Sequence, residues 1–308
     1  MTADLHVVLG TGPAGTTLAE ELLRRGHSVR TVDRAGRQVV PGAEAVAADV
    51  LDPAAARAAV AGATVVHHCV NVGYEHQVEV MPRVQRTVLD AVAAAGARLV
   101  VLDTLYPYGP SHGEALTEQS PWLATSRKGR MRAQLDEAYL ASELPVVLGR
   151  AADFYGPRVL NSSLGAATFP AALTGGTVLA LGDRAAAHSV TYIGDVASGL
   201  ATLAEAGDEA WGRVWHLPTA PAPSTDEVLD RIRTLTGAAF DVHTLSGAEP
   251  WGPFDATFMA EYEELFYQHT EPQIMDSSAF EREFSTAPTP LDDGLAATVA
   301  WYRAWLAS

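Results

Sequence analysis

The sequence of 308 residues contains one cysteine, Cys69. A single thiol forms no disulfide within the chain and excludes a four-cysteine zinc site, so we expect no metal centre. Hydrophobic runs are short, and none approaches the roughly 20 apolar residues of a membrane-spanning helix. The first apolar run, Leu5–Leu9, is too short for the core of a signal peptide. We therefore expect a cytoplasmic protein without a membrane segment.

Basic charge is also scarce. Lys and Arg number 21 against 37 Asp and Glu, which gives a formal net charge of −16. Nucleic acids are bound through clustered Lys and Arg, and anionic lipid attracts the same side chains. We therefore expect neither nucleic acid nor a membrane as a partner. A small-molecule substrate is expected instead.

Short apolar segments alternate with helical segments along the first half of the chain. Strands are expected at residues 5–9, 29–32, 45–47, 64–68, 99–102 and 146–149, and helices at 16–25, 53–60, 78–95 and 130–141. The strands show little polar alternation, which indicates burial on both faces, as in a parallel sheet covered by helices. The pattern predicts an α/β fold, a Rossmann doubly wound parallel sheet of about seven strands.

The pattern loosens after about residue 156, where Gly, Pro and Ser become frequent. We expect residues 1–156 to form the dinucleotide-binding domain, with 189–218 returning to it. Residues 157–188 and 219–308 are expected to form a smaller C-terminal substrate-binding region and tail. This tail is rich in aromatic side chains.

A glycine turn follows the first strand, with the sequence GTGPAG at residues 10–15. Gly10 allows a tight turn, Gly12 lets the backbone approach a pyrophosphate, and Gly15 permits close packing of helix on strand. The helix that follows points its free N–H groups at the phosphates. We expect Gly10, Gly12, Pro13, Ala14 and Gly15 to bind the cofactor.

The second strand ends at Asp33, whose carboxylate can accept hydrogen bonds from both ribose hydroxyls of NAD. Arg34 and Arg37 follow, and either could clamp the 2′-phosphate of NADP instead. We favour NAD and keep NADP as the alternative. Three further cofactor contacts are expected at Asp49, Cys69 and Asn71.

Four further motifs occur in order: VVHHC at 65–69, YGP at 108–110, GRAADFYGP at 149–157 and VTYIGDVA at 190–197. Together they resemble the extended short-chain dehydrogenase/reductase family, which includes NAD-dependent sugar epimerases and dehydratases. The resemblance covers nearly the whole chain. It implies an NAD(P)-dependent enzyme, and a homodimer built from helices 78–95 and 130–141.

The catalytic set departs from that family. The family uses a Ser or Thr, then a Tyr-x-x-x-Lys pair; the alignment places Thr104 and Lys128 at the first and last positions and Ala124 at the tyrosine. In the family this tyrosine gives its proton to the carbonyl as hydride arrives, while the lysine lowers its pKa and holds the nicotinamide ribose. No tyrosine lies between Tyr108 and Tyr139, so the usual acid is missing.

Nearby phenols are the candidate replacements. Tyr106 is the favoured acid, its pKa lowered by Lys128, whereas Tyr108 is expected to be mainly structural although it stays a catalytic candidate. Tyr74 and His68 are weaker candidates. Lys128 and Arg132 are four residues apart and share a helix face, so both can face a ligand.

Tyr74, Asp153 and His188 are expected to contact the substrate. His188 stands where nucleotide-sugar enzymes of the family place an arginine for the diphosphate, and Asp153 would repel phosphate. We therefore expect an oxidoreductase for a small apolar or aromatic carbonyl or alcohol, not a nucleotide sugar. The alternatives are a redox-neutral isomerase, epimerase or dehydratase with tightly held cofactor, and a non-catalytic NAD(P) sensor. Asp195 is expected to cap the helix that follows it.

Overall fold

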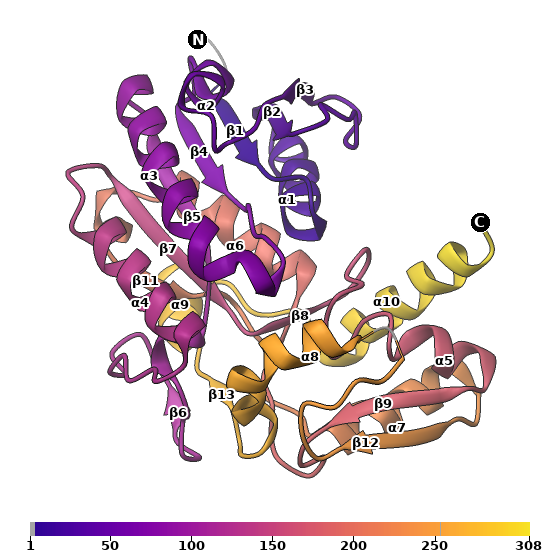
Figure 1. The fold of residues 1–308 in the computed structure, drawn as a ribbon. Coiled ribbons are helices and arrows are strands. Elements are labelled where there is room, and N and C mark those ends of the chain that lie inside the picture. The colour runs from indigo at the N-terminus through magenta and orange to yellow at the C-terminus, as the bar shows by residue number, and fades with distance from the viewer. Residues whose placement is uncertain (1–3, 253) are drawn as a thin grey trace.

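The computed structural model describes residues 4–252 and 254–308. Its centre is a seven-stranded sheet in the order β11-β7-β5-β4-β1-β2-β3 (Figure 1). All neighbouring strands in it run parallel. The strands are β1 (Leu5–Leu9), β2 (Ser28–Asp33), β3 (Glu44–Ala47), β4 (Val65–His68), β5 (Arg98–Thr104), β7 (Val146–Ala151) and β11 (Val214–His216). The predicted doubly wound Rossmann sheet is confirmed.

Helices cover both faces of this sheet, and the side chains of β1 show why. Val7 and Leu9 pack with α2, α3 and α4, whereas Val8 points to the other face and packs with α1 and α6. A strand buried on both faces needs apolar residues at successive positions, which explains the unbroken apolar runs. The helices are α1 (Pro13–Arg24), α2 (Pro53–Val60), α3 (Gln77–Ala95), α4 (Arg127–Leu140) and α6 (Ile193–Glu205).

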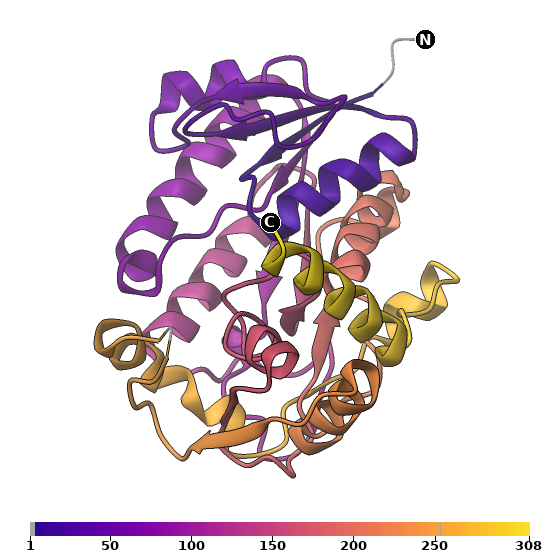
Figure 2. The same ribbon diagram turned by 90° about the vertical axis from the view of Figure 1, so that its right-hand side faces the viewer.

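The remaining elements gather mainly beyond the carboxyl ends of the strands (Figures 1 and 2). Three two-stranded parallel sheets join segments distant in sequence: β8 with β10, β9 with β12, and β6 with β13. A separate apolar core includes Phe169 and Tyr302, whose rings stack with centroids 5.0 Å apart. The strands are β6 (Ala115–Leu116), β8 (Asp153–Tyr155), β9 (Thr177–Leu181), β10 (Val190–Tyr192), β12 (Asp241–Leu245) and β13 (Ile274–Met275). The helices are α5 (Phe169–Thr174), α7 (Thr225–Thr236), α8 (Ala256–Tyr262), α9 (Ser278–Glu283) and α10 (Leu291–Leu306).

The described residues also form four 3-10 helices: η1 (Tyr74–His76), η2 (Tyr106–Tyr108), η3 (Asp208–Ala210) and η4 (Glu263–His269). Over residues 4–252 and 254–308, no helix combines the length and apolar character that crossing a bilayer requires.

The ends of some elements differ from the sequence expectations. α1 begins at Pro13, since proline suits the first position of a helix, and α4 begins at Arg127 behind the capping side chain of Ser126. The expectation that Asp195 caps a helix is wrong. α6 begins at Ile193, and the carboxylate of Asp195 instead accepts hydrogen bonds of 2.8 and 2.7 Å from the backbone N–H and the hydroxyl of Thr289.

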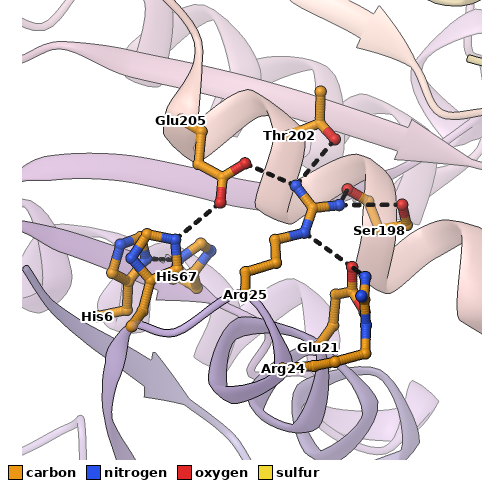
Figure 3. Close-up of polar contacts among 9 residues, drawn as sticks. His6, Glu21, Arg24, Arg25, His67, Ser198, Thr202 and Glu205 are labelled. Carbon is orange, nitrogen blue, oxygen red and sulfur yellow. Dashed lines mark hydrogen bonds and ion pairs between the residues drawn. The ribbon is translucent and has the colours of Figure 1, made fainter.

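A polar network lies between β1, β4 and the ends of α1 and α6 (Figure 3). His27 connects its two halves, because its Nε2 lies 2.7 Å from the Glu205 carboxylate and its ring packs against that of His6. Arg25 donates hydrogen bonds to the carboxylates of Glu21 and Glu205, both at 2.7 Å. Beside it, Nδ1 of His6 lies 3.0 Å from Nε2 of His67, and both imidazoles are buried. The network lies at the C-terminal ends of these helices, away from the glycine turn at the start of α1.

Candidate active site

The loop between β1 and α1 fits a dinucleotide. A Cβ at Gly10 would lie 2.9 Å from the carbonyl oxygen of Cys69, and one at Gly15 would lie 1.9 Å from the carbonyl oxygen of Gly10. At Gly12 the same position is open, with no atom of the described chain within 4 Å. Gly12 is the N-cap of α1, and no side chain of the described residues caps this helix end. The free N–H groups and the open space therefore suit a pyrophosphate.

Asp33 lies beside this turn, at the end of β2. Its Oδ2 accepts a hydrogen bond of 2.6 Å from the Thr11 hydroxyl, and its Oδ1 accepts one of 2.8 Å from the backbone of Ala35. Burial opposes ionisation, but these bonds and others from the backbone outweigh it and lower the pKa of Asp33 to about 2. The carboxylate is thus charged at neutral pH. Arg37 approaches it at 3.3 Å with a side chain that is 69% exposed, and Arg34 is exposed.

The other expected cofactor residues surround the same edge of the sheet. Pro13 and Ala14 open α1, and Cys69 follows β4 directly. Burial raises the pKa of the Cys69 thiol to about 12, so it is neutral. Asn71 lines the cavity described next, and Asp49 follows β3. All five therefore lie at the carboxyl ends of β1, β3 and β4, where ligands bind in this fold.

A cavity of about 390 Å³ opens at the carboxyl ends of β4, β5 and β7. One wall comes from the loops after these strands, and the other from β8, the segment before β10, α8 and η4. The cavity thus lies between the dinucleotide-binding sheet and the C-terminal elements. The sequence-predicted residues that line it are Asn71, Tyr74, Thr104, Tyr106, Asp153 and His188.

Tyr106 and Tyr74 share a hydrogen bond in the cavity wall, with their hydroxyl oxygens 2.9 Å apart. Burial raises the pKa of Tyr74 to about 12 and that of Tyr106 well above its usual value. The expectation that a lysine lowers the pKa of Tyr106 is therefore wrong. Both phenols stay protonated at neutral pH, so they can donate a proton but not accept one.

Tyr108 lies outside this cavity. Its hydroxyl is 2.7 Å from Nε2 of His216, whose Nδ1 faces the carbonyl oxygen of Asp276 at 2.9 Å. Because that carbonyl only accepts, Nδ1 carries the proton and Nε2 accepts from Tyr108. The ring also stacks under the guanidinium of Arg150, 4.5 Å away. These contacts support the loop after β5, as expected of a mainly structural residue.

Lys128 and Arg132, two of the cations on α4, have different surroundings. The Lys128 side chain is fully buried, and its ammonium contacts carboxylate oxygens of Glu261 and Glu264 at 2.5 and 2.9 Å. Arg132, one turn later, donates a hydrogen bond of 3.0 Å to Oδ1 of Asn71 in the cavity wall. Its buried Nε has no partner among the described residues. Lys128 therefore holds η4 and α8 in this structure, and Arg132 is the cation that reaches the cavity wall. His68 lies near Arg132, and burial lowers its pKa to about 4.

Asp153 and His188 form a pair in the opposite wall. Nε2 of His188 lies 3.2 Å from Oδ2 of Asp153, and its Nδ1 lies 3.0 Å from the carbonyl oxygen of Gln268. Burial opposes charge on both groups. The bond and the charge of the partner nevertheless keep the pKa of Asp153 below its usual value and that of His188 above it.

Several cavity residues have no counterpart in the sequence expectations. They are Asn161, Ser162, Ser163, Gln268 and Gln273, all polar. Gln273 is 2% exposed, and neither atom of its amide has a partner among the described residues. Its amide is available to a ligand that both donates and accepts. No local motif marks these positions; the aromatic-rich tail alone pointed to this region, through Phe254, Phe258 and Tyr262.

This fold and site agree with the comparison with known proteins. The chain belongs to the NAD dependent epimerase/dehydratase family, whose model matches residues 7–217. It is 29% identical over 231 residues to a dTDP-glucose 4,6-dehydratase of Streptomyces griseus, a stretch that covers 71% of this chain and 64% of that protein. It is 24% identical over 323 residues to a UDP-N-acetyl-alpha-D-glucosaminuronate decarboxylase of Bacillus cytotoxicus, with 96% of each chain covered. Resemblance to the extended short-chain dehydrogenase/reductase family is confirmed.

The solved structures show the same fold. The dTDP-glucose 4,6-dehydratase of Streptomyces venezuelae, crystallised with NAD, superposes with a TM-score of 0.80 at 22% identity and 97% coverage of each chain. The expectation of an NAD-dependent enzyme is confirmed by the family. The expectation that the substrate is not a nucleotide sugar is wrong, because the relatives are nucleotide-sugar enzymes. The charges of His188 and Asp153 are too little, by themselves, to exclude a substrate class.

Proposed function

We propose that this chain is an enzyme that binds NAD and acts on a nucleotide sugar, by dehydration, epimerisation or decarboxylation assisted by hydride transfer. The observation that carries the proposal is the cavity of about 390 Å³. It lies between the C-terminal elements and the edge of the sheet that holds the glycine turn. Bound NAD supplies a hydride acceptor and donor at this edge. The substrate classes named for the relatives support the choice of a nucleotide sugar.

The residues around the cavity have distinct roles in this proposal. The glycine turn holds the pyrophosphate and Asp33 holds the adenosine ribose, while Arg132 and Asn71 lie on the cofactor side. Thr104 and the neutral phenol of Tyr106 donate hydrogen bonds to the reacting oxygen. Gln273 offers its free amide to hydroxyls of the sugar or to polar groups of the base.

The organisation expected from the sequence belongs to the same proposal. Residues 1–156 and 189–218 would bind the dinucleotide, and residues 157–188 and 219–308 would bind the substrate. We also propose a cytoplasmic homodimer through α3 and α4. Analytical ultracentrifugation of the full chain tests the dimer.

The function is tested by incubating the purified chain with NAD and, separately, dTDP-glucose, UDP-glucose and UDP-glucuronic acid. Products are separated by chromatography and identified by mass spectrometry. We expect one of them to lose water, lose carbon dioxide or change its stereochemistry without net consumption of NAD. Failure of all three to bind or react, with NAD bound, would contradict the nucleotide-sugar proposal.

A further inference from the structure

The cavity wall contains one pair of side chains that the roles above leave unused, Asp153 and His188. Both ring nitrogens of His188 face oxygen atoms. Nδ1 faces the carbonyl oxygen of Gln268 at 3.0 Å, and Nε2 faces Oδ2 of Asp153 at 3.2 Å. A carbonyl oxygen only accepts, so Nδ1 carries a proton. The bond between Nε2 and Oδ2 then requires one further proton, which the imidazole and the carboxylate share.

Several neighbours hold this pair in place. His269 stacks on His188 with ring centroids 5.0 Å apart, and its own Nε2 bonds the Tyr262 hydroxyl at 2.7 Å. The Ser163 hydroxyl approaches Oδ2 of Asp153 at 3.4 Å. Burial lowers the pKa of His269 to about 3, so it is neutral and adds no second charge. His188 is thus the imidazole that shares its proton with Asp153, and His269 does not compete for this role.

The carboxylate has a free side. Its hydrogen bonds all go to Oδ2, and Oδ1 has no partner among residues 4–252 and 254–308. Asp153 lines the cavity, and its side chain is 24% exposed. An anionic oxygen with an open side in a substrate cavity can accept a proton from a hydroxyl there.

The other titratable groups of the cavity are poor bases. Tyr74, Tyr106 and Tyr262 are buried phenols, each with a pKa raised by burial and by the nearby charge of Asp153. They donate protons but do not accept them at neutral pH. Lys128 is outside the cavity wall and bound to two glutamates.

We propose that Asp153 is the general base of this site and that His188 is its positioning residue. As a substrate hydroxyl is oxidised, its proton passes to Oδ1 of Asp153, and the hydride on the same carbon passes with both electrons to NAD⁺. The products are a carbonyl, NADH and a protonated carboxyl group. His188 holds Oδ2 and keeps the carboxylate ionised before the step. In the reverse step Asp153 returns the proton. The inference rests on the proposed function for its substrate.

The test uses Asp153→Asn, which keeps the shape of the side chain and removes the base. With whichever of dTDP-glucose, UDP-glucose and UDP-glucuronic acid reacts, we expect kcat to fall by about 10²–10⁴-fold, while calorimetry shows unchanged NAD and dTDP binding.

In the wild type kcat falls as pH drops and Asp153 becomes protonated. His188→Gln should move this acidic limb to higher pH, because the carboxylate loses its cation; a purely structural role would not move it. Asp153→Glu should restore part of the rate. Asp226→Asn is the matched control outside the cavity, and it should leave the wild-type kcat unaltered.

Histidine NMR gives a reading that needs no substrate. In ¹⁵N-histidine-labelled protein, His188 should remain doubly protonated at neutral pH, and Asp153→Asn should make it neutral. A neutral His188 in the wild type overturns the inference, and so does an Asp153→Asn enzyme that keeps the wild-type rate when chemistry is rate-limiting. If none of the three sugars reacts, the proposed function fails, and the His188 titration still decides whether the ion pair exists.

Discussion

The hydroxyl of Thr11 donates a hydrogen bond of 2.6 Å to Oδ2 of Asp33, which joins the glycine turn to the end of β2. The bond holds the carboxylate beside the place where the adenosine ribose is expected, and it contributes to the low pKa of Asp33. A fixed negative charge there accepts from ribose hydroxyls and repels a 2′-phosphate. We therefore expect the chain to prefer NAD to NADP.

Asp33→Ser should weaken NAD binding and raise the relative affinity for NADP, because Arg34 and Arg37 then face the phosphate without a competing carboxylate. Dissociation constants for both cofactors, measured by calorimetry, check this. Thr11→Val should shift the preference in the same direction by less, since it frees the carboxylate without removing it. A wild-type chain that binds NADP more tightly would show that Asp33 does not face the ribose.

Gly12→Val should abolish most cofactor binding. Its side chain would occupy the open space in front of α1, where the pyrophosphate is expected. We expect the affinity for NAD to fall at least about tenfold, or 1.4 kcal/mol, with the thermal stability of the free protein retained. Gly247→Val is the control, because a Cβ there also meets open space, far along the chain from the turn. Unchanged NAD affinity in Gly12→Val would refute the phosphate assignment.

Tyr106→Phe keeps the ring and removes the phenolic proton. Because the proposed function has this phenol donate a hydrogen bond to the reacting oxygen, turnover should fall about 10²–10³-fold while NAD affinity stays the same. Tyr108→Phe is the matched control. It should cost about 0.5–1.5 kcal/mol of stability through the lost bond to His216, with little effect on turnover. Full activity of Tyr106→Phe under chemistry-limited conditions would show that this phenol does not contact the reacting oxygen.

Replacing Lys128 and replacing Arg132, both on α4, should have different effects. Arg132→Met should weaken NAD binding about tenfold, because Asn71 loses its partner in the cavity wall. Lys128→Met should leave the charges of Glu261 and Glu264 without their buried partner, so it should lower stability by about 1–3 kcal/mol. Calorimetry and urea unfolding measure the two effects. A large loss of NAD affinity in Lys128→Met alone would restore the ribose-holding role expected for that lysine.

Stability should decrease in mild acid because of the buried pair of His6 and His67. Burial lowers the pKa of His6 from 6.5 to about 4, and that of His67 falls well below its ordinary value. Between pH 6.5 and about 4 the unfolded chain binds protons that the folded chain excludes. The contribution of these histidines to the free energy of unfolding is therefore fully present above pH 6.5 and is lost as pH falls toward 4. For His6 alone the loss is roughly 3 kcal/mol.

Urea unfolding across this pH range measures the effect. Replacing the pair, as His6→Leu with His67→Leu, should reduce the pH dependence, and the part that remains comes from other buried imidazoles such as those of His68 and His269. His112→Asn is the control, since His112 has an 81% exposed side chain. A wild-type stability that does not change between neutral pH and pH 4 would show that the two imidazoles become protonated without unfolding.

The sequence by itself determined the sheet and the cofactor end of the site. Apolar runs separated by helical segments identify buried parallel strands, and the residue spacing of a glycine turn is local, so Gly10, Gly12 and Gly15 could be read directly. Asp33 follows from the same reasoning, since it ends the next strand of the unit. These features depend on neighbours within about 25 residues, where periodicity and turn chemistry are informative.

Only the tertiary structure decided the other side of the cavity. The partners of Lys128 lie more than 130 residues away, on α8 and η4. No local pattern reveals that its ammonium forms ion pairs with Glu261 and Glu264. The fold buries the phenol of Tyr106 among other tyrosines, and this burial raises its pKa. The sequence by itself predicts the opposite shift, since Lys128 is expected to lower the pKa of this phenol. Considered by residue type alone, Asp153 and His188 are each a poor phosphate anchor. Folding brings them together, and their shared proton gives them a chemistry that neither residue type predicts alone.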